Sequence, residues 1–184
     1  MIGPSIQSKT PGAQGVQTNR RLNVPIKYRT PTVTSIGGRG GHVRSADGIL
    51  DLQLAVPKDL GGPGGKTNPE ELFAAGYAAC FHSAVKRVAA EKGLAIGHSA
   101  VDANVSLGAD DDDSGFTLVA ELHVTLPGTD VEHAKDVVCL ANLMCPYSNA
   151  TRDNIEVTLS VTPADGHHYA VTQSDVARNV CLSR

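Results

Sequence analysis

Three stretches in the second half of the chain alternate apolar and polar residues, and each predicts a β-strand with one buried face. They occupy residues 101–107, 116–126 and 155–161. In the longest of them, the side expected to face the core consists of Phe116, Leu118, Ala120, Leu122, Val124 and Leu126. Together these strands predict a sheet that is covered on one face and open to solvent on the other.

A hairpin is predicted earlier in the chain, from residues 42–44 and 49–56, which flank the turn-forming pair Asp47-Gly48. The second of these strands also alternates, with leucine or valine at every second position. Residues 26–36 carry a weaker strand signal that Pro31 interrupts, which suggests an edge strand.

The longest helical pattern begins after Asn68, a residue suited to accept hydrogen bonds from the first turn of a helix. Pro69 fits the first helical position, and Glu71 stands where a capping box needs an acidic residue. Gly93 supplies a stop at the other end. The first half of this helix, residues 72–81, is apolar on nearly every side, so we expect it to be buried.

A second helix is predicted from a cap at Thr129 or Asp130 to about residue 144. It ends at Cys145-Pro146, because a residue before proline disfavours the α conformation. A turn is expected to follow, shaped by three polar residues, of which the arginine could also pair with a nearby acid: Ser148, Asn149 and Arg152.

Strands with one buried face, interrupted by two helices, predict an α+β domain with mostly antiparallel sheets. We place this domain at residues 26–162, after a loop-rich, flexible and basic extension at 1–25. Residues 163–184 form a polar C-terminal extension in which only 175–182 suggests a short helix. Acidic residues at 110–113 predict a solvated hairpin loop between two of the strands.

The composition excludes several classes of function. No run of eighteen apolar residues is present, so the sequence predicts no membrane span, and a net charge of −3 favours no nucleic-acid or membrane partner. Residues 1–46 nevertheless contain seven basic residues and no acid. Such a start is typical of an organelle transit peptide, or of a basic tail that carries no targeting signal. We therefore expect a cytoplasmic protein, with a mitochondrial one as the alternative.

Four cysteines, at positions 80, 139, 145 and 181, match neither a zinc pattern nor a disulfide scaffold. Reduced thiols in a reducing compartment are the default, and we expect no metal site. Cys80 lies in the apolar part of the long helix, where it is either a small core residue or a reactive thiol. Cys139 and Cys181 are interpreted as bystander thiols, with a regulatory disulfide as the alternative.

A reactive Cys80 would need a cation from elsewhere in the fold, because burial raises the pKa of a thiol and the thiolate is the nucleophile. Arg39, in the glycine-rich turn GGRGG, is the best candidate, with Arg44 as the second choice, and Glu70 could hold the guanidinium by a bidentate contact. Ten residues of helix separate Glu70 from Cys80, which is about 15 Å along the axis. The contacts therefore require an irregular first turn, a mobile Arg39 or a dimer interface.

Two segments of the chain carry a resemblance to a known family. Residues 57–80, PKDLGGPGGKTNPEELFAAGYAAC, and residues 145–155, CPYSNATRDNI, resemble the two signature segments of organic hydroperoxide resistance proteins. These proteins form the peroxidase branch of the OsmC-like superfamily. The similarity extends over residues 28–161 and leaves both extensions unmatched.

The resemblance implies a function and a set of roles. Cys80 is similar to the peroxidatic cysteine of the family and Cys145 to its resolving cysteine, while Arg39 matches the thiolate-stabilising arginine and Glu70 its carboxylate partner. The implied reaction reduces alkyl or fatty-acid hydroperoxides to alcohols through a Cys80 sulfenic acid and a Cys80–Cys145 disulfide, which protects against oxidative stress. An apolar pocket is expected to bind the substrate, lined by Leu72, Phe73, Tyr77, Phe81 and Met144.

The resemblance also implies the assembly and the reductant. The expected fold is the OsmC-like one, an intertwined homodimer in which antiparallel sheets pack around two central helices and the active sites lie at the subunit interface. Dihydrolipoyl groups of lipoylated proteins are the expected electron donor, and no bound cofactor is needed.

The chain also departs from the family pattern. Asn142 stands where the family commonly has a histidine, and no acidic or amide residue follows Arg39 in GGRGG. Two other functions stay open on the residues alone. One is a thiol hydrolase or transferase that uses Cys80 without resolution, and the other is a non-enzymatic module that senses lipids or peroxides.

Overall fold

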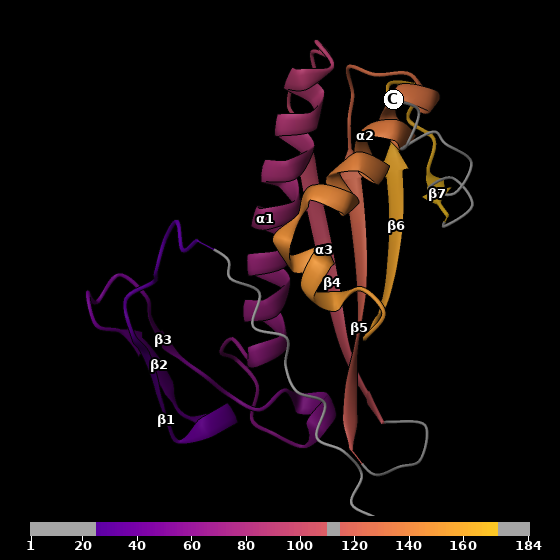
Figure 1. The fold of residues 1–184 in the computed structure, drawn as a ribbon. Coiled ribbons are helices and arrows are strands. Elements are labelled where there is room, and N and C mark those ends of the chain that lie inside the picture. The colour runs from indigo at the N-terminus through magenta and orange to yellow at the C-terminus, as the bar shows by residue number, and fades with distance from the viewer. Residues whose placement is uncertain (1–24, 110–114, 173–184) are drawn as a thin grey trace, which may run out of the picture.

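The structure is a computed structural model that describes residues 25–109 and 115–172. Figure 1 shows a long helix, α1, beside a four-stranded sheet, with a smaller three-stranded sheet standing away from both. The basic N-terminal extension up to residue 24, the acidic loop and the C-terminal helix expected at 175–182 lie outside the described residues. Within the described part of the chain, no helix is long and apolar enough to cross a membrane.

The larger sheet consists of β4 (Ala100–Ala109), β5 (Phe116–Thr125), β6 (Glu156–Thr162) and β7 (Tyr169–Val171), in that order. The three predicted alternating strands are confirmed as β4, β5 and β6. The pairing differs from the prediction in one place, because β6 runs parallel to β5. The chain between them crosses the sheet through two helices, and such a crossover returns the strand in the parallel direction. The three residues of β7, too few for a recognisable pattern, lie in the segment assigned to the C-terminal extension.

The smaller sheet consists of β1 (Val33–Ile36), β2 (His42–Ser45) and β3 (Asp51–Gln53), all antiparallel. The predicted hairpin is confirmed, although its second strand is shorter than expected because Leu54 instead forms a parallel bridge with Thr67. The weak strand signal at 26–36 yields only the four residues of β1, all after Pro31. The sheet leaves five large apolar side chains in or near it largely exposed: Ile26, Tyr28, Val33, Ile36 and Ile49.

Helix α1 (Pro69–Glu91) begins as the sequence predicts. The side chain of Asn68 accepts a hydrogen bond of 2.9 Å from the backbone N–H of Glu71. The carboxylate of Glu71 accepts a bond of 2.8 Å from the Thr67 hydroxyl, so it braces the residue before the cap. This pair of contacts fixes the entry of the chain into α1.

We expect Asn68→Ala to lower the free energy of unfolding by about 1 kcal/mol, because it leaves an N-terminal N–H of α1 without its acceptor. Urea denaturation of both proteins measures the difference. Asn68→Asp is the matched control, since a carboxylate retains the acceptor and should unfold within about 0.5 kcal/mol of the parent. Equal destabilisation by the two substitutions would contradict a capping role.

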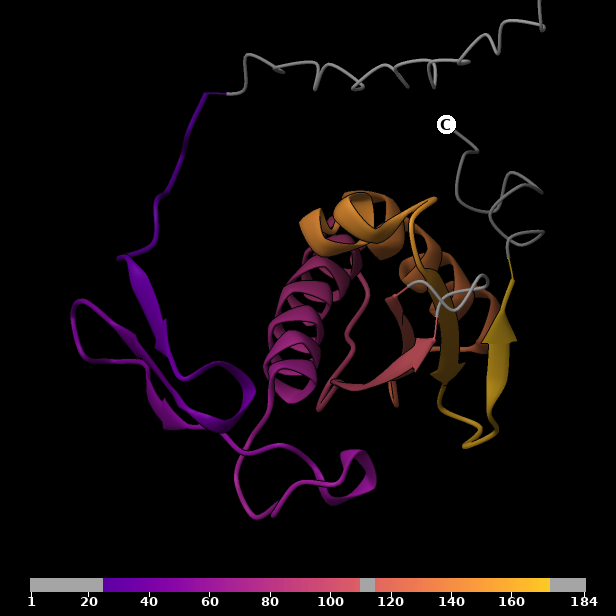
Figure 2. The same ribbon diagram turned by 90° about the horizontal axis from the view of Figure 1, so that it is seen from below.

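Only one face of α1 is buried, which corrects the expectation that residues 72–81 are enclosed on nearly every side. The buried residues follow a helical repeat along the face turned to the larger sheet and α2: Tyr77, Phe81, Ala84, Val85, Val88 and Ala89. Ala75, Ala79 and Ser83 lie on the opposite side and are exposed. Within the described residues, the elements that contact α1 are the larger sheet, α2 and α3, and they pack on its other face (Figure 2).

Helix α2 (Val131–Met144) starts at Asp130, whose side chain accepts from the backbone N–H of His133 at 2.9 Å. The predicted cap and end are both confirmed. A third helix, α3 (Pro146–Thr151), occupies the segment where only a turn was expected. Proline at its first position requires no N–H, which allows a new helix to start immediately. Cys145 therefore forms the corner between α2 and α3, with extended backbone angles of φ −66° and ψ 123°.

The core lies between α1, α2 and the inner face of the larger sheet. The apolar side predicted for β5 is buried from Ala120 to Leu126. The two residues at the start of this side are exceptions, because Phe116 is 78% exposed and Leu118 is only partly buried. Figure 1 shows that β4 and β5 continue past the N-terminal end of α1, so α1 does not cover this end of the sheet.

Candidate active site

The fold brings two cysteines from distant parts of the sequence into contact. Cys80 lies halfway along α1 and Cys145 lies at the corner between α2 and α3, with 3.6 Å between the two sulfur atoms. Cys145 is fully buried, whereas Cys80 is partly exposed. A disulfide needs about 2.05 Å, so small side-chain rotations would suffice to form the bond. Cys139 is buried within α2, and Cys181 lies outside the described residues.

The corner that carries Cys145 is held by backbone hydrogen bonds on both sides. Its own N–H donates to the carbonyl of Ala141 at 2.8 Å, and its carbonyl accepts from the N–H of Asn149 at 3.0 Å. Arg152 reinforces the corner by donating to the carbonyl of Asn142 at 2.8 Å and to the side chain of Asn149 at 2.9 Å. Arg152 therefore binds the last turn of α2 and the side-chain amide of Asn149. The acidic partner that the sequence suggested for it is not the group it binds.

Burial raises the pKa of the Cys80 thiol above its usual range. The backbone N–H of Tyr147 opposes this by donating to the sulfur, while the contact with Cys145 raises the pKa further. Either thiol can donate in the contact between the two sulfurs. Cys80 in the isolated chain is therefore a protonated thiol at neutral pH, and it would require a cation to become a nucleophile.

Arg39 and Glu70 form a second cluster. The guanidinium donates to both carboxylate oxygens, at 2.8 and 2.6 Å, in the bidentate geometry that the sequence suggested. The Glu70 side chain is only 12% exposed, and its hydrogen bonds with Arg39 hold the pKa of the carboxyl below its ordinary value. The same hydrogen bonds raise the pKa of Arg39. Both groups therefore stay charged across the physiological pH range.

The backbone geometry of the turn around Arg39 explains why its neighbours are glycines. Residues 38–40 form a single 3-10 turn, preceded by Gly37 at φ 78°. A Cβ atom on Gly41 would stand 1.8 Å from the carbonyl oxygen of Ile36, so no other residue fits there without a shift of the backbone. The close approach of the two backbones closes the loop and directs Arg39 toward the start of α1.

Arg39 does not reach Cys80 within one chain. Among the described residues, no hydrogen bond or ion pair joins the guanidinium to the sulfur, and burial of Cys80 is compensated by no charged group. α1 is continuous from Pro69 to Glu91, so the option of an irregular first turn is removed. The chain therefore presents two separate half-sites on one helix, about 15 Å apart.

The five residues expected to bind substrate fall into different environments. Tyr77 and Phe81 are fully buried, so in the single chain they present no surface to a ligand. Leu72 and Phe73 are partly buried on the first turns of α1, and Met144 is exposed.

Tyr147 was not singled out by the sequence, although it stands two residues after Cys145. Its ring lies against those of Phe73 and Tyr77, with centroid distances of 6.2 and 5.8 Å. Gly76 makes this approach possible, because a Cβ atom there would lie 3.0 Å from the Tyr147 hydroxyl oxygen. Phe73, Tyr77 and Tyr147 thus form an aromatic cluster beside the thiol pair.

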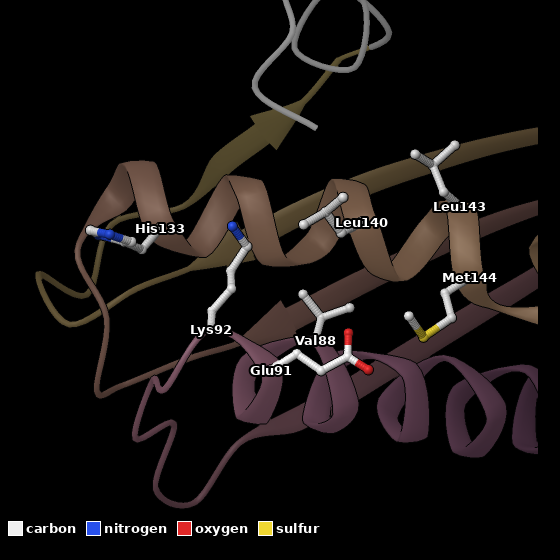
Figure 3. Close-up of a pocket in the computed structure, with 7 residues that line it drawn as sticks. All are labelled: Val88, Glu91, Lys92, His133, Leu140, Leu143 and Met144. Carbon is white, nitrogen blue, oxygen red and sulfur yellow. The ribbon is translucent and has the colours of Figure 1, made fainter. Parts of the chain in front are cut away.

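A groove with a volume of about 670 Å³ lies between α1 and α2. Figure 3 shows the residues that line it. Its lining comprises Val88, Glu91, Lys92, His133, Leu140, Leu143 and Met144. Met144 is the one residue of the expected substrate pocket that lines it, and it directly precedes Cys145. Lys92 forms an ion pair with Asp136 at the far end. Within residues 25–109 and 115–172, no three His, Cys, Asp or Glu residues are grouped to hold a metal ion.

A family model described as OsmC-like protein matches residues 62–160. The organic hydroperoxide resistance protein of Xanthomonas axonopodis pv. citri is 48% identical over 134 residues, which cover 72% of this chain and 93% of that protein. The organic hydroperoxide resistance protein OhrB of Bacillus subtilis is 46% identical over 134 residues, covering 72% of this chain and 96% of the relative.

Solved structures agree with these sequence matches. The crystal structure of an organic hydroperoxide resistance protein OsmC from Legionella pneumophila superposes with a TM-score of 0.71 at 46% identity, covering 74% of this chain and 98% of that one. The structure of OhrB from Bacillus subtilis gives a TM-score of 0.66 at 44% identity, covering 72% and 98%. The matched residues 62–160 include both Cys80 and Cys145, and the similarity covers nearly the whole length of each relative.

Proposed function

The chain belongs to the OsmC-like family, among the organic hydroperoxide resistance proteins, and we propose that it is a thiol peroxidase that reduces organic hydroperoxides to alcohols. The relatives are named for resistance to such peroxides, which supports a role in peroxide detoxification under oxidative stress. The observation that carries the proposed chemistry is the 3.6 Å contact between the sulfurs of Cys80 and Cys145.

The proposed reaction proceeds in two steps. The Cys80 thiolate attacks the distal oxygen of the hydroperoxide, the O–O bond breaks, and the alkoxide takes up a proton to leave as the alcohol. The sulfur has then lost two electrons and is a sulfenic acid. The Cys145 thiol attacks this sulfur, the S–O bond breaks, and water leaves as the disulfide forms.

A thiol hydrolase or transferase without resolution is the second candidate. Such an enzyme needs only one cysteine. The contact of the Cys80 sulfur with a second, fully buried sulfur favours the two-cysteine reaction.

We propose a homodimer because two features lack a partner among residues 25–109 and 115–172. The β1–β3 sheet stands away from the core with its large apolar side chains exposed, and the outer face of α1 carries small residues that allow close helix packing. If two α1 helices cross antiparallel near Ala75, Glu70 of the partner subunit lies beside Cys80, since each residue is five positions from Ala75. Arg39 of the partner subunit would then supply the missing cation.

We propose that the substrate binds on the accessible apolar surface next to Cys80. Leu72, Phe73 and Met144 would contact the alkyl chain directly, with Tyr77 and Phe81 packed behind them. Such a surface favours a lipid-like hydroperoxide over hydrogen peroxide, which has no apolar part to bury.

Reduction of the disulfide is assigned to dihydrolipoyl groups, on the strength of the family resemblance. The test is steady-state turnover of cumene hydroperoxide and a fatty-acid hydroperoxide with dihydrolipoamide, thioredoxin or glutathione as donor. Fast turnover with dihydrolipoamide alone is expected. Equal turnover with thioredoxin would contradict the lipoyl assignment, and no turnover with any donor would overturn the peroxidase proposal.

We expect Cys145→Ser to react once with hydroperoxide at a rate within about threefold of the parent and then to stall, because its sulfenic acid has no second sulfur to close on. Excess peroxide should convert the Cys80 thiol to the sulfinic acid, which adds two oxygen atoms and raises the mass by about 32 Da. Intact-protein mass spectrometry measures both species. Sustained turnover with dihydrolipoamide in this variant would show instead that Cys145 is dispensable.

We propose a reducing compartment, the cytoplasm, because the mechanism requires thiols that can be regenerated. The mitochondrial alternative depended on the basic N-terminus, of which the first 24 residues lie outside the described structure. The relatives named above come from bacteria and do not support it.

A further inference from the structure

A cluster of hydroxyl groups is buried in the otherwise apolar contact between α1 and α3. The Tyr77 hydroxyl oxygen lies 3.1 Å from the Ser148 hydroxyl and 3.2 Å from the Thr151 hydroxyl. All three side chains are nearly inaccessible, with exposed fractions of 0%, 2% and 6%. A hydroxyl group in such a place is retained only if it is hydrogen-bonded, and each of these bonds joins residues more than 70 positions apart.

The hydroxyl cluster is directly connected to the segment that carries the resolving cysteine. α3 starts at Pro146, the residue after Cys145, and Tyr147 in its first turn donates its backbone N–H to the Cys80 sulfur. The Thr151 hydroxyl also donates to the carbonyl of Tyr147, at 3.0 Å. The bonds of Tyr77 therefore fix α3, and with it the Cys145 corner, on the same helix that holds Cys80.

The other side of α3 is fastened by Arg152, which binds the carbonyl of Asn142 at the end of α2. Cys145 lies between this surface contact and the buried hydroxyl cluster. A loss of either contact would let α3 move relative to α1, and the distance between the two sulfurs would no longer be held near 3.6 Å. The buried contact has the greater effect, because it joins α3 to the helix of Cys80 directly.

We propose that Tyr77 is a positioning residue whose hydroxyl, through Ser148 and Thr151, holds Cys145 ready to close the disulfide. The inference rests on the proposed peroxidase function. A Cys80 sulfenic acid has two fates: attack by the Cys145 thiol, which releases water and forms the disulfide, or oxidation by a second hydroperoxide to the sulfinic acid. Tyr77 touches neither reacting group, and it acts by favouring the first fate over the second.

The test is Tyr77→Phe, which removes the hydroxyl and retains the ring packed against Phe73 and Phe81 at 5.9 and 6.4 Å. We expect Cys80 to be oxidised by cumene hydroperoxide at a rate within about twofold of the parent, while disulfide closure slows about tenfold, because both buried hydrogen bonds of the Tyr77 hydroxyl are lost. The sulfinic fraction at a fixed peroxide dose should rise in proportion. Rapid-quench mass spectrometry follows all three species.

Tyr169→Phe is the matched control, because its hydroxyl binds the exposed Asp165 at 2.7 Å in the loop before β7. It should leave closure unchanged. Thr151→Val provides a second variant in case Tyr77→Phe does not fold, and we expect closure to slow about threefold, since it removes one of the two hydrogen-bond partners of the Tyr77 hydroxyl. Unchanged closure in a folded Tyr77→Phe protein would overturn the inference.

Diamide, a thiol oxidant that needs no peroxidase activity, separates this inference from the proposed function. Failure of the parent protein to react with hydroperoxides would refute the peroxidase proposal alone. Closure of the Cys80–Cys145 disulfide by diamide would still be about tenfold slower in Tyr77→Phe if the hydroxyl positions Cys145. Equal rates with diamide would refute the positioning role whatever the substrate.

Discussion

Replacing Cys80 with serine is expected to lower kcat/KM for organic hydroperoxides by at least about 10³-fold, which would be loss of turnover in practice. A serine hydroxyl is a far weaker nucleophile than a thiolate, and it cannot accept the peroxide oxygen as a sulfenic acid. The nearby Cys145 cannot substitute, because it is fully buried. Consumption of cumene hydroperoxide with dihydrolipoamide as donor measures the effect.

Cys139→Ala is the matched control for this experiment. Cys139 is also a buried cysteine on a core helix, but it is a member of neither half-site. Its replacement should leave kcat/KM within about twofold. Activity that persists in Cys80→Ser would refute the peroxidase assignment. Binding of apolar ligands by a parent protein that consumes no hydroperoxide would instead identify a sensing module.

Replacing Arg39 with alanine is expected to slow the oxidation of Cys80 about 100-fold at pH 7. Burial raises the pKa of the thiol, and a cation that lowers it by about two units contributes roughly 2.7 kcal/mol. Without that cation the thiolate fraction at pH 7 falls about 100-fold. The rate in Arg39→Ala should recover as the pH rises, because the thiol then ionises without help. Stopped-flow kinetics from pH 5 to about 10 measures the shift.

Arg44→Ala is the matched control, since Arg44 lies on the neighbouring strand, is mostly exposed and pairs with Asp51 at 3.4 Å. It should leave the pH profile unchanged. In the parent protein, the Arg39–Glu70 ion pair stabilises the folded state fully at a pH above the usual pKa of a glutamate. This stabilisation is lost as the pH falls through the lowered pKa of Glu70. An identical pH profile for Arg39→Ala and the parent would show that Arg39 does not act on Cys80.

Mixed dimers distinguish a site within one chain from a site across the interface. A Cys80→Ser subunit still offers Arg39 to its partner, and an Arg39→Ala subunit still offers Cys80. If sites form across the interface, refolding an equal mixture should restore about a quarter of the parent activity, since half of the dimers are mixed and each has one complete site. A site contained in one chain would show no restoration.

Several helices and strands could be predicted from the sequence because the interactions that form them involve residues close together in the chain. The caps at Asn68 and Asp130 act within one helical turn, and the alternation in β4, β5 and β6 follows from which face of a strand is buried. The parallel pairing of β5 and β6 was missed because it depends on the path of the chain across the sheet. β7 and α3 were missed because three and six residues are too few to show a periodic pattern.

The candidate site divides in the same way. The sequence by itself determined the candidate residues, through the two family segments. The helical rise between Glu70 and Cys80 also indicated that one arginine could not easily bridge both along a straight helix. Only the tertiary structure decided that the sulfurs of Cys80 and Cys145 touch, that Tyr77 is a buried hydroxyl anchor and that one face of α1 is open. These facts depend on how helices distant in sequence pack together, and no local pattern of residues records that packing.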